Sequence, residues 1–498
     1  MQNLSKSKLI AFRQCKKRLW LEIHRKDLLV NSASSEANFA VGRRVDELAR
    51  QHYDTNNDAR LIDRAAGFTQ ALSASILALK TAKPVFEAGF SADGAISFAD
   101  IMLPQRTGKR LTWRMVEVKS STSVKPYHED DVAIQAYIAK AAGVQLHSVA
   151  VAHINKNWVY SGKKDYNGLL IENDLGVDAR DDEVKGWISA AQRVVQKTKE
   201  PAIKTGSHCN TPFPCPFIAH CQAQEPTAEY PTAWLPNVRT GGLKALLSTI
   251  SELAEVPDDA LNLLQLRVKT QTLSNEVYFA KNAALAELSV HQGPYYFLDF
   301  ETINLAVPIW KGTKPYQQIP FQFSLHRVNR NSKIEHRCFI DLSGKNPSKA
   351  IAEALIRDCG TRGTIFAYGA SFEKACIKAL AERLPKLRVQ LLAIHARIVD
   401  LLKTAREHYY HPGQEGSWSI KAVLPNIAPV LKYEALDVQD GQMAMQAYAE
   451  AITPGTSKNR VAEIQKQLEA YCKLDTFGLL HIWAYFIGRT ILMSESDV

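Results

Sequence analysis

Val116-Glu117-Val118-Lys119-Ser120 is the stretch that most restricts the fold. It alternates apolar and polar residues as a strand does, and Phe98-Ala99-Asp100-Ile101 upstream has the same character. The residues between them include proline, glycine and a polar run, which predicts a turn. Two strands joined by a turn set Asp100 near Glu117. Glu117 and Lys119 are two residues apart, so they face the same side of their strand.

Two carboxylates beside an ammonium group are suited to one kind of chemistry. The carboxylates can hold a divalent metal ion, and the ammonium can lie beside a phosphate or an attacking water. These three groups are the minimum needed to hydrolyse a phosphodiester bond. On spacing alone, an ordinary solvated strand with a Glu-x-Lys pattern remains the alternative.

Length and composition indicate a multidomain protein that does not cross a membrane. The chain has 498 residues, of which 46% are hydrophobic, and two or three domains are expected. It contains no run of eighteen apolar residues and no apolar signal segment at its start, so we expect a cytoplasmic protein without a membrane partner. The formal net charge of +10 favours a polyanionic partner, although a merely basic cytosolic protein fits as well.

Four of the eight cysteines have a distinctive distribution. Three recur every six residues in a proline-interrupted segment, and one lies near the N-terminus, which predicts a wrapping loop whose thiolates converge on one metal centre. The set is Cys15, Cys209, Cys215 and Cys221, with His208 and His220 as alternative ligands. Zinc sites usually have closely spaced cysteine pairs, so the loose spacing favours an iron–sulfur cluster. Zinc and four buried free cysteines remain open.

Together these residues resemble the RecB-like PD-(D/E)XK nucleases that carry a [4Fe-4S] cluster, over about residues 1–225. The resemblance implies a restriction-endonuclease-like mixed sheet, a cluster held by the four cysteines, and a catalytic centre that binds Mg²⁺ or Mn²⁺. The catalytic residues that it implies are Asp100, Glu117, Lys119, Gln135 and Tyr137. The last two fall in residues 130–140, which have an amphipathic helical pattern.

The chain departs from this resemblance at one metal ligand. Many relatives have a histidine on an early helix after a glycine, whereas this chain has Asp46 four residues after Gly42. Asp46 can ligate a metal through oxygen or be an ordinary helix surface residue. Glu87 is a weaker candidate.

A second acidic group follows a helical connector expected at residues 226–290. Asp299 and Glu301 end a buried-type strand on one face. Tyr471 and Asp475, four residues apart, share one face of a helix expected over 461–487. Glu373 is predicted at a helix start that closely follows a strand.

These motifs resemble the DEDD-type 3′–5′ exonucleases, whose fold is RNase H-like, over about residues 291–498. The resemblance assigns catalytic roles to Asp299, Glu301, Glu373, Tyr471 and Asp475, with two divalent ions held by the carboxylates. The second motif departs from the family, because Gly369 replaces its asparagine and Glu373 its aspartate. Asp400 reads as structural.

The sequence therefore predicts an α/β protein with two nuclease domains. We expect a DNA substrate, single-stranded or with a free end, in end processing, repair or defence. One alternative is an RNA-processing 3′–5′ exonuclease whose N-terminal domain mainly binds nucleic acid. The other is a non-catalytic nucleic-acid-binding scaffold.

Overall fold

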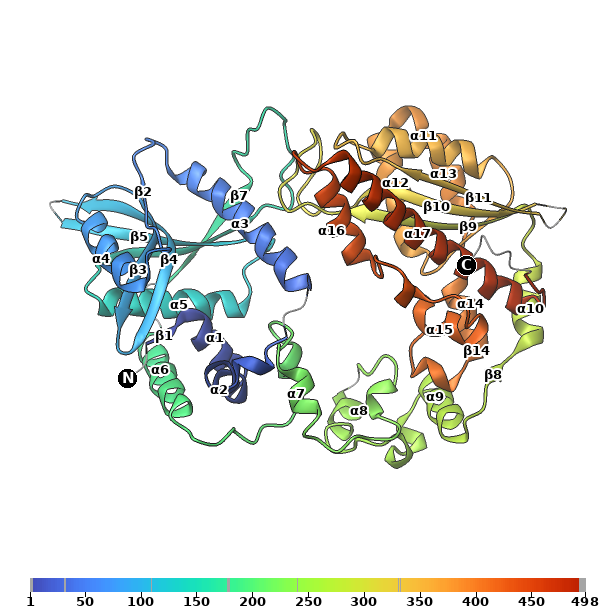
Figure 1. Ribbon diagram of the computed structural model, residues 1–498, viewed down its shortest axis with the longest axis horizontal. Coiled ribbons are helices and arrows are strands. Elements are labelled where there is room, and N and C mark those ends of the chain that lie inside the picture. The colour runs from blue at the N-terminus through green and yellow to red at the C-terminus, as the bar shows by residue number, and fades with distance from the viewer. Residues whose placement is uncertain are drawn as a thin grey trace. The chain divides into compact units, whose positions relative to one another are not determined.

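The computed structural model is a mixed α/β protein, shown in Figure 1. It describes residues 3–30, 33–108, 110–176, 180–239, 241–329, 331 and 333–491. The chain divides into two compact units. Unit 1 comprises residues 1–226 and 305–316, and unit 2 comprises residues 227–304 and 317–498.

The two units differ from the expected domains in two places. Of the helical connector expected at residues 226–290, all but residue 226 is part of unit 2. Residues 305–316 follow a strand of unit 2 but belong to unit 1, where Ala306 and Val307 are buried among its core residues. A buried contact of this kind joins residues far apart in sequence, so no local pattern predicts it.

Unit 1 is built on a mixed sheet in the order β2-β3-β4-β5-β6-β7, with β1 paired to β4. Its strands are β1 (Leu4–Ser5), β2 (Arg60–Leu61), β3 (Val85–Ala92), β4 (Ala95–Thr107), β5 (Arg110–Lys119), β6 (Leu146–Ile154) and β7 (Leu170–Leu175). Its helices are α1 (Lys6–Gln14), α2 (Lys16–His24), α3 (Ala33–Tyr53), α4 (Phe68–Leu79), α5 (Pro126–Ala141), α6 (Asp181–Val195) and α7 (Ile218–Gln222).

The predicted hairpin is confirmed, because β4 and β5 pair antiparallel with Ile101 opposite Val116. The alternation of β5 separates two cores. Met115 belongs to the core under α1, α5 and α6, whereas Val116 and Val118 belong to the core under α3 and residues 305–316. Glu117 and Lys119 share the face of Met115, so their side chains point toward α1 and α5.

Unit 2 is built on a mixed sheet in the order β11-β10-β9-β12-β13, beside a small β8-β14 pair. Its strands are β8 (Tyr278–Phe279), β9 (Tyr295–Ile303), β10 (Ile319–Val328), β11 (Ile334–Ile340), β12 (Thr364–Ala367), β13 (Ile398–Asp400) and β14 (Tyr409–Tyr410). Its helices are α8 (Gly241–Leu246), α9 (Leu263–Ser274), α10 (Lys281–Ser289), α11 (Ser348–Cys359), α12 (Ser371–Arg383), α13 (Arg388–Ala396), α14 (Leu401–His408), α15 (Ile420–Ile427), α16 (Gly441–Ala451) and α17 (Lys458–Phe486).

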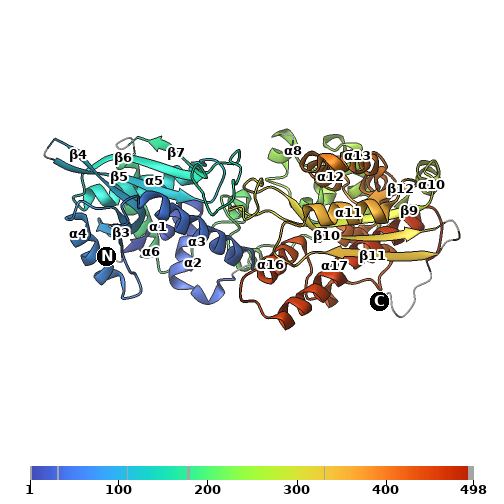
Figure 2. The same cartoon turned by 90° about the horizontal axis from the view of Figure 1, so that it is seen from above.

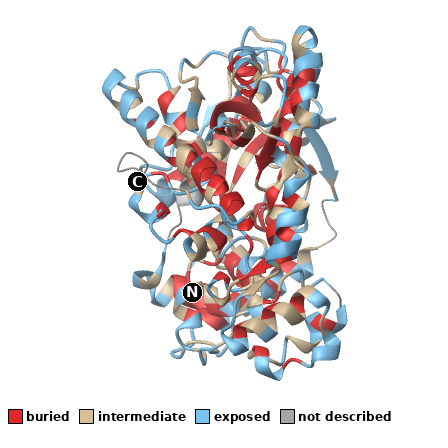
Figure 3. Cartoon of the chain, turned by 90° about the vertical axis from the view of Figure 1, so that its right-hand side faces the viewer, coloured by how far each residue is buried: buried red, intermediate tan, exposed pale blue. Residues whose placement is uncertain are grey.

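Helices cover both faces of the unit 2 sheet. Helices α11, α12 and α13 lie on one face and α17 on the other (Figure 2). Buried residues gather on the central strands and on the helix faces that pack against them (Figure 3). Along β9, Leu298 and Phe300 enter the core of the first face, and Phe297 packs on Trp483 of α17. Asp299 and Glu301 continue the Phe297 face, so they point toward α17.

Candidate functional site

The first acidic group lies where β4 and β5 separate. The ladder between them runs to the pair Ile101 and Val116, and one residue further on the Asp100 carboxylate replaces it. Asp100 Oδ2 accepts a hydrogen bond from the Val118 backbone N–H at 2.8 Å. The ladder between β4 and β5 therefore ends here, and Asp100 and Glu117 lie beside each other as the hairpin pattern predicts.

Glu117 is almost fully buried, with 2% of its surface exposed, and both of its oxygens accept hydrogen bonds. Lys119 Nζ and Lys6 Nζ donate to Oε1 at 2.7 and 2.8 Å. Gln135 Nε2 on α5 donates to Oε2 at 2.6 Å. The structure therefore brings Glu117, Lys119 and Gln135 together, as expected. The Gln135 Oε1 atom is buried without a hydrogen-bond partner in the described part of the chain.

Two residues of this cluster were not predicted from the sequence. Asp131, one turn before Gln135 on α5, accepts hydrogen bonds from Lys119 and Lys6. Lys6 is the first residue of α1 and reaches the cluster from more than a hundred residues away in the chain. The i, i+4 spacing of Asp131 and Gln135 is a signal that they share a helix face. No local signal identifies Lys6.

The carboxyl groups of the cluster differ in how readily they ionise. Burial, and then the nearby Glu117 carboxylate, raises the pKa of Asp100 well above its ordinary value. Burial also opposes ionisation of Glu117, but the Lys119 and Lys6 ammonium groups outweigh it and lower the pKa of Glu117. Burial and the carboxylates of Glu87 and Glu117 raise the pKa of Asp46 to about 6. The site thus holds two carboxyl groups that a divalent cation would favour in the ionised form.

Asp46 and Glu87 border this cluster. Asp46 lies on α3, and its pKa responds to both Glu87 and Glu117. The register of β3 with β4 places Glu87 opposite Asp100, since Phe86 opposes Ile101 and Ala88 opposes Ala99. Its φ of 57° is left-handed, a backbone conformation that is costly for a residue with a side chain.

Tyr137 lies apart from the Glu117 cluster. Its hydroxyl donates to Asp93 in the turn between β3 and β4, and it packs in the core under α5. It is two residues from Gln135 on the same helix, so the two side chains leave the helix in different directions. We therefore assign Tyr137 to packing and not to the Glu117 cluster.

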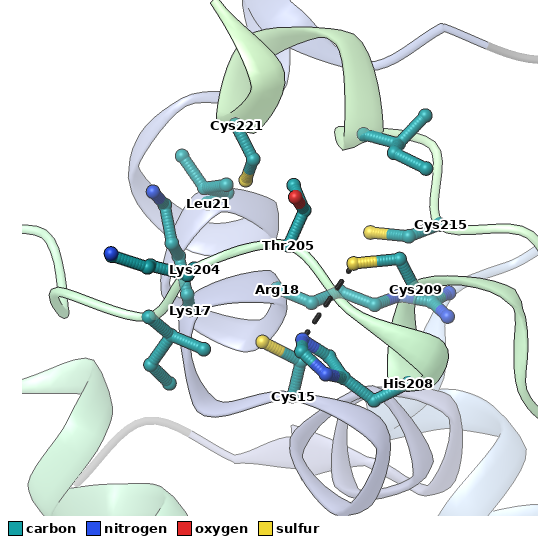
Figure 4. A pocket seen from close by; sticks show the side chains of 12 residues that line it. Cys15, Lys17, Arg18, Leu21, Lys204, Thr205, His208, Cys209, Cys215 and Cys221 are labelled. Carbon is teal, nitrogen blue, oxygen red and sulfur yellow. Dashed lines mark hydrogen bonds between the residues drawn. The ribbon is translucent and has the colours of Figure 1, made fainter. Parts of the chain in front are cut away.

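The four predicted cysteines line one pocket (Figure 4). Cys15 ends α1, and the other three come from residues 207–222, with their sulfur atoms directed into a common space. Gln14 fastens the two segments, because its Nε2 donates to the His208 carbonyl at 2.8 Å and the Phe213 carbonyl at 2.7 Å. His208 also lines the pocket, and its ring lies 3.6 Å from the Cys209 sulfur. His220 contacts Glu200 instead.

The distances between the sulfur atoms bear on the kind of metal centre that the pocket could hold. Two sulfurs on one zinc ion lie at most about 4.6 Å apart, because each Zn–S bond is about 2.3 Å. Among the described residues, no three of these sulfurs come within 4.8 Å of one another. Burial raises the pKa of the Cys221 thiol, and the Lys17 ammonium acts against it.

The second acidic group joins β9 to α17. Ligand atoms of Asp299, Glu301 and Cys472 all lie within 4.8 Å of one another. Cys472 Sγ is 3.6 Å from Asp299 Oδ2. Cys472 was not predicted from the sequence, although it lies between the predicted Tyr471 and Asp475 and is buried.

Asp475 and Tyr471 face the same place from α17. Asp475 is 6% exposed, and its Oδ1 accepts a hydrogen bond from the Tyr433 hydroxyl at 2.6 Å. Tyr471 also hydrogen-bonds to Asp475, and burial together with that carboxylate raises the pKa of the Tyr471 hydroxyl. Tyr433 comes from a short turn after α15, and no motif in the sequence marked it.

Glu373 and Asp400 have different roles. Glu373, the third residue of α12, is 3% exposed, and its Oε2 has no hydrogen-bond partner within the described residues. Burial raises the pKa of Asp299, and the Glu373 carboxylate adds to this after those of Asp475 and Glu301. Asp400 caps α14 and accepts from the Gly369 and Leu402 backbone N–H groups at 2.9 and 3.1 Å. Asp400 is structural, as its sequence suggested.

All four acids of this group are driven toward the protonated form. Burial, and then Asp475, raises the pKa of Asp299 and Glu301 well above their ordinary values. Burial raises the pKa of Asp475 to about 6 and that of Glu373 to about 7. Carboxylates packed together in this way repel one another unless a proton or a cation lies between them.

Comparisons with known proteins place a match on this second group. A family model described as a domain of unknown function (DUF2779) matches residues 296–419. The matched range contains Asp299, Glu301 and Glu373 and ends before α17. An uncharacterized Mycoplasma pneumoniae protein, described as an MG366 homolog, is 25% identical over 205 residues. These cover 37% of this chain and 31% of that protein, so the chain spans about a third of its relative.

Within the described residues, no helix has both the length and the apolar character needed to cross a membrane.

Proposed function

We propose that the protein is a metal-dependent nuclease with one phosphodiester-cutting site in each unit. One observation carries this proposal: each unit gathers buried carboxyl groups from its central strands and a covering helix. The pKa values of Asp100 and Asp299 are raised, and a bound divalent cation would lower them. Unit 1 would be a RecB-like PD-(D/E)XK domain of restriction-endonuclease-like fold. Unit 2 would be a DEDD-type exonuclease domain of RNase H-like fold.

The donor sets suit Mg²⁺ or Mn²⁺. In unit 1 the ligands would be Asp100 and Glu117, with Asp46 at the border; in unit 2 they would be Asp299, Glu301 and Asp475. Oxygen ligands are those that hard divalent cations prefer. A bound metal ion supplies an activated water and neutralises charge on the phosphate. The Lys119 ammonium would hold the phosphate in unit 1, and the Tyr471 hydroxyl would orient the attacking water in unit 2.

The cysteine pocket would hold a [4Fe-4S] cluster. Its thiolates would join the two ends of the first segment of unit 1, since Cys15 and Cys221 lie near the two ends of residues 1–226. The buried Lys17 and the neighbouring Arg18 would offset part of the negative charge of the thiolates. We propose a structural role for the cluster as a clamp.

The substrate would be DNA, single-stranded or with a free end, as in end processing, repair or defence. The decisive assay offers the purified protein end-labelled linear and circular single-stranded DNA, duplex DNA and RNA of one sequence, with Mn²⁺ or with EDTA. We expect linear single-stranded DNA to be degraded with Mn²⁺ and preserved with EDTA. Degradation of RNA alone would favour the RNA-processing alternative. No degradation of any substrate would favour the scaffold alternative.

The cluster makes a separate prediction. Protein purified without oxygen should be brown and contain about four iron atoms per chain. Cys15→Ser should lose most of this iron and melt at a lower temperature, because a metal centre that closes a fold contributes to its stability. Cys338→Ser is the matched control, since Cys338 lies outside the pocket and should leave the iron unchanged. A colourless wild-type protein with one zinc ion per chain would refute the cluster.

A further inference from the structure

Unit 1 holds a second lysine, Lys6, beside Lys119, the lysine that the proposed reaction uses. Lys6 Nζ lies 2.8 Å from Glu117 Oε1 and 3.2 Å from Asp131 Oδ1. Lys119 contacts the same two carboxylates. Two ammonium groups and two carboxylates therefore alternate around a square, and each cation bridges both anions.

The position of Lys6 is set by the fold and not by a flexible tail. Leu4 in β1 pairs with Ala95 of β4, and Leu4 is buried. Ser5 then caps α1 by accepting from the Lys8 backbone N–H. Lys6 follows as the first residue of the helix, and Leu9 on the same helix is also buried. The backbone thus delivers the Lys6 side chain to the end of β5.

A second lysine with only 23% of its side chain exposed costs free energy unless its charge is used. Burial lowers the pKa of an ammonium group, yet the Asp131 and Glu117 carboxylates more than offset this and raise the pKa of Lys6. Lys119 alone already contacts both carboxylates. If Glu117 were to ligate a metal ion, its negative charge would be paired with that ion, and two ammonium groups would then face the single carboxylate of Asp131. The excess positive charge suits one anion, the phosphate of the strand that is cut.

We propose that Lys6 is a second phosphate-binding residue of unit 1, acting together with Lys119 on the phosphodiester that is cleaved. Asp131 holds both ammonium groups in place through its two oxygens. The inference rests on the proposed nuclease activity of unit 1. It adds a residue outside the Asp100–Glu117–Lys119 motif, which the sequence pattern did not mark.

The test measures unit 1 alone. All variants carry Asp299→Asn to silence unit 2, and Lys6→Met is compared with Lys8→Met. Lys8 is the matched control because it lies two residues further along α1 and contacts Glu22 instead. We expect Lys6→Met to lower kcat/KM on single-stranded DNA by about 100-fold. Lys6→Arg, which keeps the charge, should lose about 10-fold or less, and Lys8→Met should change little.

A readout besides activity separates phosphate binding from a structural role. Equilibrium binding of a single-stranded oligonucleotide with Ca²⁺ is measured over a range of salt concentrations. Loss of one phosphate contact should reduce the slope of log K against log salt by about 0.7. Lys6→Gln, which keeps a hydrogen-bond donor without the charge, should show the same reduced slope, and it replaces Lys6→Met if that variant does not fold.

Each outcome decides the inference. An unchanged kcat/KM and salt slope for both neutral variants would overturn it. A loss of activity with an unchanged slope and a lower melting temperature would also overturn it, because Lys6 would then only support the fold. If Glu117→Gln retains full activity in the Asp299→Asn protein, the proposed function of unit 1 fails, and that failure is distinct from the failure of Lys6.

Discussion

Replacing Glu117 by glutamine should slow DNA cleavage by unit 1 by about three orders of magnitude, measured in protein that also carries Asp299→Asn. Glutamine keeps the size of Glu117 and can still accept from Lys119, but it removes the one carboxyl of the cluster whose pKa is lowered. A thousandfold loss corresponds to about 4 kcal/mol of transition-state stabilisation, which is the size expected for losing a metal ligand. The same substitution should weaken Mn²⁺ binding to unit 1, measured by calorimetry.

Tyr137→Phe discriminates between the resemblance and the geometry. The resemblance assigns Tyr137 to catalysis, but its hydroxyl donates to the exposed Asp93. We therefore expect Tyr137→Phe to cleave at nearly the wild-type rate and to lose about 1 kcal/mol of stability with the hydrogen bond. A thousandfold loss of rate in this variant would show that the placement of Tyr137 is wrong.

Asp299→Asn should have the second large effect, on unit 2. Cleavage by unit 2, measured in protein that carries Glu117→Gln, should fall by about three orders of magnitude because one of the converging ligands is lost. The same substitution should stabilise unit 2 by about 1–2 kcal/mol in EDTA, since it removes one of several mutually repelling buried acids. Loss of activity with a gain of stability is the signature of a functional carboxylate.

The stability of unit 2 should fall as the pH rises. Asp475 and Glu373 have folded-state pKa values raised to about 6 and about 7, so the folded unit binds more protons than the unfolded chain between about pH 4 and 7. Their contribution to stability is therefore complete below their ordinary pKa values and is lost as the pH rises through 7. In EDTA unit 2 should melt at a lower temperature at pH 8 than at pH 5. Mn²⁺ should reverse this in the wild type but not in Asp299→Asn.

Asp400→Asn is the matched control for Asp299→Asn. Asp400 caps α14 through Oδ1, and asparagine is an equally good helix cap. Activity and stability should therefore stay close to those of the wild type. A large loss of activity in Asp400→Asn would move Asp400 into the site, and an unchanged activity in Asp299→Asn would remove Asp299 from it.

Short-range patterns predicted what lies on one strand or one helix. The two-residue spacing of Glu117 with Lys119, and of Asp299 with Glu301, follows from the geometry of a strand. The sequence could not supply Lys6, Asp131 or Cys472, because their roles depend on which helices cover the strand ends. A periodic pattern indicates which face of a helix is buried, but not what that face meets.

Tyr137 shows that a place in a motif does not predict what a side chain contacts. Its place in a motif suggested a role, whereas its direction on α5, two residues from Gln135, takes the hydroxyl to Asp93. The resemblance aligned a residue type, and the helix geometry determined what it contacts. Predicted motif residues that do not share a helix face deserve a direct test before a role is assigned.

Residues 305–316 have a consequence for how the protein is made. Ala306 and Val307 complete the core beneath Val116 and Val118. They are synthesised after the residues of β9, which belongs to unit 2. During vectorial synthesis on the ribosome, unit 1 therefore cannot finish folding until residue 316 has emerged. A translation product that stops at residue 226 would carry the whole Asp100–Glu117–Lys119 motif on an incomplete scaffold. The proposed cutting centre of unit 1 would therefore be completed only in a nascent chain that already contains the first strand of the unit 2 sheet.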